Sequence, residues 1–165
     1  MQRATRAPVA GESLLHPAAI AAVLTLVAND HYLKHAAPGV VTGKLSDVAG
    51  LVFFPLLLQA GWETSQVLIG RRWRPSLRVL SLCVVATGVV FAAVQVVPGA
   101  ADAYRVALGW LRWPLEALLA VASGRELPAQ FRVRHTPDLT DLLALPALAV
   151  PWWVGRRRAV LSSPA

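Results

Sequence analysis

The sequence predicts an all-α integral membrane protein with four transmembrane helices and one amphipathic helix at the membrane surface. Of its 165 residues, 56% are hydrophobic, and the mean hydropathy is +0.53. A soluble domain of this length is less apolar, so a bilayer is the expected environment of the chain. Long apolar runs alternate with short polar segments, and arginines gather where the apolar runs end. We therefore expect residues 1–165 to form a single membrane domain.

The clearest transmembrane run covers residues 79–97, between Arg78 and Pro98. A helix of this length crosses the ~30 Å of hydrocarbon in a bilayer. The same criterion of length and apolar character places the four spans at about 14–34, 47–70, 78–98 and 138–155. The last of them ends near Trp152 and Trp153, and tryptophan favours the interface between membrane and water.

Residues 101–123 are expected to form an amphipathic helix at the surface instead of a fifth span. Its charged residues recur at helical spacing on one stripe, and they are Asp102, Arg105, Arg112 and Glu116. Burying each charge at the middle of the bilayer costs about 2.5–3.5 kcal/mol. A helix that lies in the interface keeps these charges in water and sinks its leucines and tryptophans into the headgroup boundary.

The net charge of +7 comes mostly from arginines that flank the apolar runs. The main groups are Arg3 and Arg6, Arg71 to Arg78, and Arg156 to Arg158. A nucleic-acid-binding protein clusters its basic residues on one polar face, so we expect no nucleic-acid partner. Positively charged residues mark cytoplasmic segments of membrane proteins, which places both termini in the cytoplasm.

The N-terminal part has the size of a secretory signal peptide, because a basic start precedes the apolar run 17–28. Cleavage after Ala28 would require a small residue at Leu26, and leucine is not small. We expect the first helix to stay in the protein as an anchor.

Polar residues collect on the outer face of this topology, where the first helix ends and the second and fourth helices begin. We nominate for catalysis Asp30, His31, Asp47, His135 and Asp141, and for binding Asn29, Lys34, Lys44 and Asp138. Ionisable residues near a membrane are costly, so such a group indicates a functional site.

Some of these residues also have a structural interpretation as helix caps. Ser46 or Asp47 is placed to cap the second helix, and Asp138 is placed to cap the fourth. Oxygen atoms of such side chains accept hydrogen bonds from the unpaired N–H groups of a first helical turn.

Asp30 is not explained by capping, because the dipole at the end of a helix disfavours an acid. It needs a cationic partner. Lys34 is a local partner four residues later, and His135 or Lys44 is a partner across the bundle.

Three chemistries are compatible with the outer residues. Carboxylates and imidazoles bind divalent metal ions, although the sequence shows no metal-ligand spacing motif. A histidine with an aspartate partner acts as general base on a lipid headgroup or a cell-wall precursor. Acids within a membrane also serve proton-coupled transport. The residues do not decide between these chemistries, and they indicate no particular cofactor.

A second polar set lies toward the inner end of the second helix, where Gln59, Glu63 and Gln66 share one helix face. Glu63 either pairs with Arg71 or Arg72 at the interface or faces the interior of the bundle. In the second case it marks the other half of a polar pathway.

The motifs NDHYLK, TGKLSD and TDLLALP lie in residues 29–34, 42–47 and 140–146. With the stretch around them, the chain resembles a set of small bacterial multi-pass membrane proteins that share these motifs. The resemblance covers most of the chain and implies a bacterial inner membrane, but it implies no activity.

The segment ELPAQFRVRHTPDLTDLLALPALAV is similar in layout to the final segment of VanZ-like envelope proteins. On this resemblance Glu126, Gln130 and Asp141 are further site residues. The spacing from Glu126 to Gln130 is longer than in those proteins, and their Asp-Lys…His entry to the second helix is missing here.

Our hypothesis from the sequence is a protein of the inner membrane whose outer Asp/His residues bind or process an envelope lipid or its headgroup. The first alternative is a non-enzymatic scaffold, or a VanZ-like envelope protein, in which these residues are structural and a membrane protein is the partner. The second alternative is a small transporter. The lipid bilayer is a partner in all three.

Overall fold

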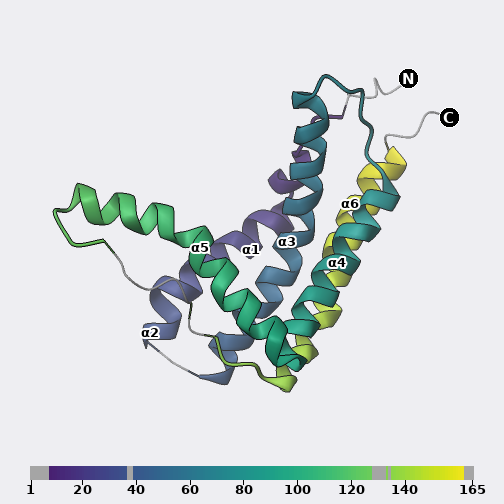
Figure 1. Ribbon diagram of the computed structural model, residues 1–165. Coiled ribbons are helices and arrows are strands. Elements are labelled where there is room, and N and C mark those ends of the chain that lie inside the picture. The colour runs from purple at the N-terminus through teal and green to yellow at the C-terminus, as the bar shows by residue number, and fades with distance from the viewer. Residues whose placement is uncertain (1–7, 37–38, 128–132, 134, 162–165) are drawn as a thin grey trace. The chain divides into compact units, whose positions relative to one another are not determined.

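The fold is all-α, as the sequence predicts. A computed structural model describes residues 8–36, 39–127, 133 and 135–161, and within these residues it contains helices and connecting segments but no strand (Figure 1). The chain divides into two compact units. The first unit comprises Met1–Val89 and Leu143–Ala165, and the second comprises Val90–Leu142.

The N-terminal helix of the first unit is built from four consecutive pieces. They are the 3₁₀ turn η1 (Glu12–Leu15), α1 (Pro17–Ala28), the π-helical turn η2 (Asn29–Leu33) and α2 (Lys34–Ala36). Pro17 begins α1, where a missing N–H costs nothing, and His16 Nδ1 accepts the Ala18 N–H at 3.1 Å. The helix changes to π geometry where the apolar residues end, and such turns are frequent at functional sites.

The long helix α3 covers Val40–Leu68 and begins earlier than the expected start near residue 47. The capping role that the sequence predicts for Ser46 or Asp47 is therefore wrong, because both residues lie inside the helix. The first turn is instead closed at Gly39, whose N–H donates to Thr42 Oγ1 at 3.2 Å. Thr42 Oγ1 donates in return to the Gly39 carbonyl at 2.9 Å.

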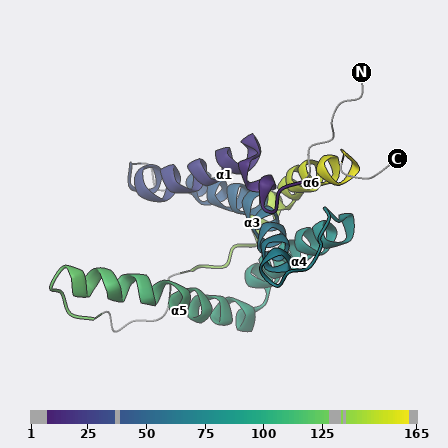
Figure 2. The same cartoon turned by 90° about the horizontal axis from the view of Figure 1, so that it is seen from above.

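The core of the first unit forms where α1 lies along α3 (Figure 2). Helix α6 (Ala149–Leu161) and η1 also contact α3. The buried clusters contain Ala19, Leu56 and Val154 in one group, and Ala22, Ala49 and Val52 in another. The alanines let the helix backbones approach closely, which is the usual packing of helices in membranes.

Helix α4 (Leu77–Val96) begins in the first unit and ends in the second. Two glycines allow its close packing within the first unit. A Cβ added at Gly155 would lie 2.6 Å from Leu80 Cδ1, and one added at Gly88 would lie 2.8 Å from Leu148 Cδ1. Gly155 is the tighter position, because three atoms of the Leu80 side chain lie within 3.1 Å of the added Cβ, whereas at Gly88 only the flexible end of Leu148 would have to move.

The expected fourth helix consists of the 3₁₀ segment η3 (Leu139–Leu148) followed by α6. A 3₁₀ helix of this length is uncommon. Two prolines explain the irregularity, because Pro146 and Pro151 lack the N–H groups that an α-helix would use at these positions. The α6 part continues to Leu161, beyond the expected end near residue 155.

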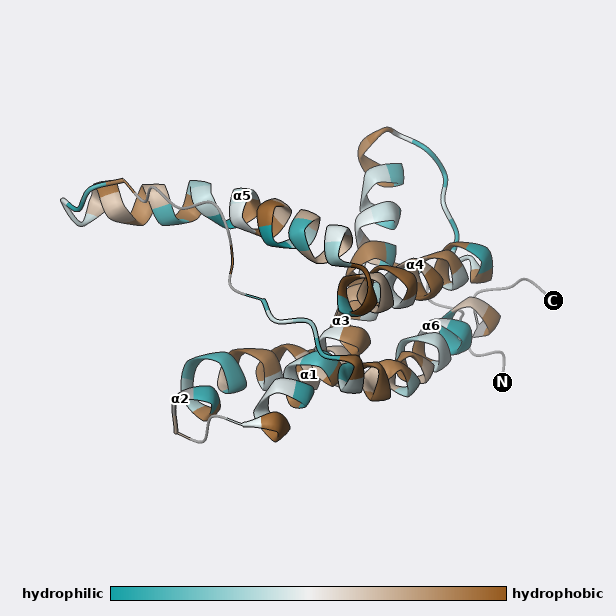
Figure 3. Ribbon diagram, turned by 60° about the horizontal axis from the view of Figure 1, so that its bottom comes forward, coloured by the Kyte–Doolittle hydropathy of each residue, from teal (hydrophilic) through white to brown (hydrophobic). Residues whose placement is uncertain are grey.

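The second unit contains α5 (Pro98–Ala122), which matches the expected amphipathic segment. Arg105 pairs with Asp102 at 2.6 Å and Arg112 pairs with Glu116 at 3.0 Å, so the charges do share one stripe. Exposed apolar residues follow the same helix, namely Leu111, Leu115, Leu118 and Leu119. Figure 3 shows both kinds of residue along the α5 ribbon.

Two helices in the described part of the chain are long and apolar enough to cross a membrane, by length and composition. They are α3 with 29 residues and α4 with 20. Only 28% and 22% of their most apolar stretches are buried within the chain. Figure 3 shows the hydrophobic residues along the ribbons of α3 and α4.

Candidate functional site

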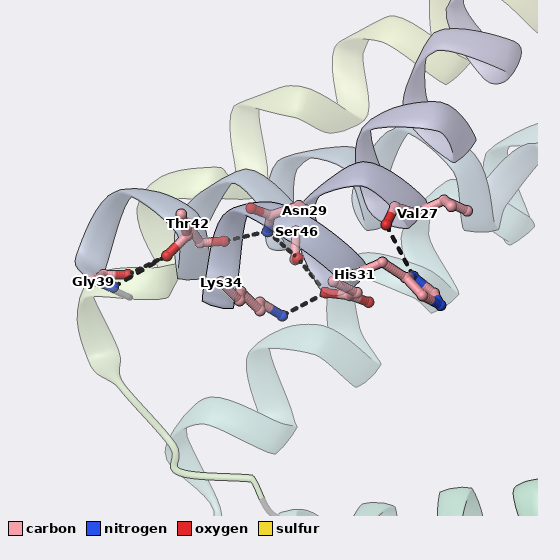
Figure 4. Close-up of polar contacts among 8 residues, drawn as sticks. Val27, Asn29, His31, Lys34, Gly39, Thr42 and Ser46 are labelled. Atoms are coloured by element: carbon pink, nitrogen blue, oxygen red, sulfur yellow. Dashed lines mark hydrogen bonds and ion pairs between the residues drawn. The ribbon is translucent and has the colours of Figure 1, made fainter. Parts of the chain in front are cut away.

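A polar cluster of the first unit joins η2 to the first turns of α3 (Figure 4). The Asn29 side chain is fully buried, and its Nδ2 donates to the Thr42 carbonyl at 2.5 Å and to Ser46 Oγ at 2.7 Å. Ser46 Oγ donates in turn to Asp30 Oδ1 at 3.1 Å. We call Asn29, Asp30, Lys34, Thr42 and Ser46 the Asn29 cluster. Its hydrogen bonds connect η2 to α3.

Asp30 has the local cationic partner that the sequence offers. Lys34 Nζ lies 2.6 Å from Asp30 Oδ1, and the two side chains are 43% and 51% exposed. An exposed pair four residues apart stabilises a helix by a few tenths of a kcal/mol. The carboxylate therefore stays accessible to water while it holds Ser46 and Lys34.

His31 is directed toward its own helix. Its Nδ1 lies 3.0 Å from the Val27 carbonyl, so the ring donates a hydrogen bond from Nδ1 to that oxygen (Figure 4). The carbonyl fixes the ring as a carboxylate partner would, although it supplies no negative charge. Lys44 and Asp47 are partly buried in the first turns of α3.

A separate polar group in the second unit surrounds His135. The Arg105 guanidinium donates from Nε and Nη2 to the His135 carbonyl at 3.0 and 2.6 Å. The Tyr104 ring meets the imidazole edge-on at 5.2 Å between centroids. The Val133 N–H donates to the Arg105 carbonyl at 3.1 Å. These contacts hold the segment before η3 against α5.

The surroundings of His135 favour its neutral form. Burial lowers the pKa of the imidazole from its usual 6.5, and the Arg105 cation lowers it further. The Asp141 carboxylate and a hydrogen bond to the Val94 backbone act in the opposite direction but are weaker. A neutral imidazole at neutral pH has the protonation state that a general base requires.

Gln95 organises the two aspartates of this segment. It is 5% exposed, its Nε2 donates to Asp141 Oδ2 at 3.2 Å, and its Oε1 accepts the Asp138 N–H at 3.1 Å. Asp138 Oδ1 accepts the Thr140 N–H at 2.8 Å, which confirms the predicted capping of η3. Glu126 is exposed, and Gln130 lies outside the described residues.

The nominated outer residues therefore form two groups. Asn29, Asp30 and Lys34 gather around Ser46 in the first unit. In the second unit Asp138 and Asp141 bond to Gln95, and His135 lies against Arg105 and Tyr104. Among the residues that the structure describes, no set of three or more His, Cys, Asp or Glu side chains is close enough to hold a metal ion.

The inner polar set contains a buried ion pair. Glu63 is 3% exposed, and both of its oxygens accept hydrogen bonds from Arg158 Nη1, at 2.7 and 2.9 Å. Glu63 also accepts the Gly11 N–H at 2.9 Å and the Gln59 Nε2 at 3.2 Å. The predicted partners of Glu63 in the 71–72 segment are wrong, because α6 packs against α3 and brings Arg158 to the carboxylate.

A cavity of about 180 Å³ adjoins this pair at the C-terminal end of α3. Its lining residues come from α3, the following connection and the start of α4, and they are Gln59, Trp62, Glu63, Gln66, Arg72, Trp73, Arg74, Ser76 and Val79. We call it the Arg72 pocket. The three residues of the inner polar set thus share one pocket, with Arg72 and Arg74 at its rim.

Three organising residues were missed by the sequence analysis. Gln95 was visible only as an amide near the end of an apolar run, and Arg105 only as one charge of a surface stripe. Arg158 was interpreted as one of the arginines that mark a cytoplasmic segment. A partner distant in sequence gives each of them its role, and sequence spacing carries no signal of such a partner.

Comparisons of the chain with protein-family models, with curated proteins and with solved structures found no match. The chemistry of the sites is therefore argued from their side chains. The Asn29 cluster connects helices, the His135 group favours the neutral form of its imidazole, and the Arg72 pocket offers two guanidinium groups to an anion.

Proposed function

We propose that this chain is a four-span protein of a bacterial inner membrane, with both termini in the cytoplasm, that works as a non-enzymatic scaffold. In this proposal the Asn29 cluster is structural, and it fastens the first helix to α3 at the outer face. The observation that carries the proposal is the Asn29 side chain, which is fully buried and bonds both the Thr42 carbonyl and Ser46.

The membrane placement is supported by the exposed apolar residues of two helices. In α4, Leu82, Val85 and Val89 are 69%, 60% and 61% exposed. Water disfavours such a surface, whereas lipid chains cover it without cost. Helix α5 also fits a position in the interface, since its leucines are exposed beside a stripe of paired charges.

The tryptophans and arginines of α6 support a position of its C-terminal part at the boundary between membrane and water. The Arg156 guanidinium lies 5.5 Å from the Trp152 ring, and the Arg157 guanidinium lies 3.5 Å from the Trp153 ring. Tryptophan and arginine together favour the boundary between lipid and water, and arginines there mark the cytoplasmic side.

The structural role of the Asn29 cluster is tested by comparing Asn29→Ala with His31→Ala. Asn29→Ala removes the two bonds that the Asn29 side chain donates to α3, so we expect a loss of about 1–2 kcal/mol of stability in detergent. His31→Ala removes one bond within its own helix and serves as the matched control, with less than about 0.5 kcal/mol lost. Equal stability of the two variants would overturn the structural role.

The topology is tested by labelling single cysteines in a Cys83→Ala background, which leaves each variant with one thiol. Ala36→Cys and Ser123→Cys are expected to react with a membrane-impermeant maleimide added to intact spheroplasts. Arg71→Cys is expected to react only after the membrane is opened. Labelling of Arg71→Cys in intact spheroplasts would contradict the four-span arrangement.

Processing of a lipid headgroup by the outer residues stays a prediction, and the same variants address it. If His31 is catalytic, the variant His31→Ala stays folded but no longer turns over an envelope lipid. A transporter would instead require a continuous polar path between Asp30 and Glu63, and Asp30→Asn would then stop uptake while the protein stays folded.

A further inference from the structure

We propose that the Arg72 pocket binds the phosphate group of an anionic phospholipid headgroup. The proposal rests on the membrane placement given above, because that placement puts the end of α3 at the cytoplasmic surface. It does not depend on the role of the Asn29 cluster.

The pocket has the size and position for a headgroup. It encloses about 180 Å³ between the last turns of α3 and the first turn of α4, where the chain leaves one apolar helix and enters the next. Both helices are long and apolar enough to cross a membrane. A cavity at their shared end therefore opens at the level of the phosphates.

The charge of the pocket favours an anion. Arg72 and Arg74 line it and are exposed, and within the described residues neither forms an ion pair. Glu63 is the acid in the lining, and its carboxylate already receives two hydrogen bonds from Arg158 and one from Gly11. Its negative charge is thus neutralised, and the two guanidinium groups dominate the field at the rim. Guanidinium binds phosphate oxygens through parallel hydrogen bonds.

Gln59 adds an acceptor at the buried side of the pocket. Its Nε2 donates to the Glu63 carboxylate, which fixes the orientation of the amide. Gln59 is 1% exposed, and its Oε1 has no hydrogen-bond partner among the described residues. Leaving a buried oxygen without a hydrogen bond destabilises the chain, so a donor on the ligand would be favourable there. A phosphatidylglycerol headgroup carries a phosphate together with such hydroxyl donors.

Two tryptophans complete the site. Trp62 and Trp73 line the pocket, and the Arg158 guanidinium lies 5.5 Å from the centroid of the Trp73 ring. Tryptophan rings favour the headgroup region because one edge is polar and the faces are apolar. They can contact the glycerol and upper acyl parts of a lipid whose phosphate is held by the arginines.

The test measures lipid binding to the full chain purified in a neutral detergent, by native mass spectrometry with increasing phosphatidylglycerol. Phosphatidylcholine is the comparison lipid, and inorganic phosphate is added in a separate titration as a competitor. The variant R72Q/R74Q removes the two charges that line the pocket. The matched control R71Q/R78Q removes two charges from the same segment at exposed residues that do not line it.

We expect phosphatidylglycerol to bind more tightly than phosphatidylcholine, and R72Q/R74Q to weaken its binding about 10- to 30-fold. R71Q/R78Q should weaken it by no more than about threefold. Unchanged thermal unfolding of both variants, with R72Q and R74Q also measured singly, shows that the loss comes from the pocket.

Three results would overturn the proposal. Equal losses in the two double variants would mean that the arginines act as a diffuse basic surface. Equal binding of the two lipids would exclude recognition of an anionic headgroup. Displacement of the lipid by millimolar inorganic phosphate would assign the pocket to free phosphate. Because these measurements are made in detergent, they are independent of the cysteine labelling, so failure of the topology and failure of the pocket are distinguishable.

Discussion

The two ends of α3 hold the N-terminal segment by different means. At the Asn29 cluster, a neutral buried amide and a half-exposed ion pair connect η2 to the helix. At the other end, a fully buried carboxylate meets one arginine and two further donors. The difference is burial, because a charge can leave water only when several donors replace its hydration.

The comparison also shows how α1 is positioned. Its N-terminal side is fixed where Gly11 donates to Glu63 and where the Val9 carbonyl accepts from Arg158. Its C-terminal side is fixed where Asn29 donates to the start of α3. Between these two points the contacts are small and apolar, with Ala19 and Ala22 at the interface. Polar contacts therefore set the register of the two helices, and close packing holds them together.

The largest effect is expected from breaking the buried pair with Arg158→Met. Glu63 then keeps a buried charge without its cation, so we expect a loss of about 3–5 kcal/mol in the free energy of unfolding. Titration of the protein with a denaturing detergent measures it. Arg157→Met is the control, because Arg157 is exposed over the Trp153 ring. Similar losses of stability in both variants would mean that the ion pair of Glu63 and Arg158 does not stabilise the C-terminal end of α3.

A smaller effect is expected from Ser46→Ala at the other end of α3. The substitution removes one bond to Asn29 and one to Asp30, so about 0.5–1.5 kcal/mol should be lost. Ser65→Ala is a matched control on the same helix, because the hydrogen bond that the Ser65 hydroxyl donates among the described residues goes to the Trp62 carbonyl of its own helix. If Ser65→Ala is destabilised as much as Ser46→Ala, hydrogen bonds between helices contribute no more to stability here than a bond within one helix.

The sequence predicted the helices better than their partners. Apolar runs and charge stripes depend on local order along the chain, so α4 and α5 were expected close to their observed bounds. The pair of Asp30 and Lys34 was expected for the same reason, since one helical turn separates them. Glu63 and Arg158 are 95 residues apart, and only the packing of α6 on α3 brings them together.

The start of α3 was placed too late because the motif TGKLSD has the appearance of a cap. In the folded chain the preceding valines, Val40 and Val41, continue the helix to Gly39. Ser46 is then turned toward Asn29 and Asp30 instead of the helix end. A capping pattern is satisfied equally well by a partner from another helix, so local pattern alone does not locate a helix start.

A still smaller loss of stability is expected for Lys34→Gln. Its dependence on salt distinguishes the exposed ion pair of the Asn29 cluster from the buried pair of Glu63 and Arg158. The pair with Asp30 is exposed and screened, so its loss should cost a few tenths of a kcal/mol at low salt and less at high salt. The effect of Arg158→Met should vary little with salt, because the partner of Arg158 is buried. Unfolding measured at two ionic strengths checks both variants. A salt-dependent effect of Arg158→Met would indicate that water reaches the Glu63 pair.

The stability of the second unit should depend on pH through His135, although the partial exposure of this residue makes the effect small. Because the folded chain lowers the pKa of His135, its neutral form is favoured on folding. This contribution to stability is complete above the unfolded value of 6.5 and is lost as the pH falls through the lower folded value. Thermal unfolding between pH 7.5 and 5 should therefore decline less in His135→Asn than in the native chain. An identical profile for His135→Asn and the native chain would show that burial of His135 does not couple its protonation to the fold.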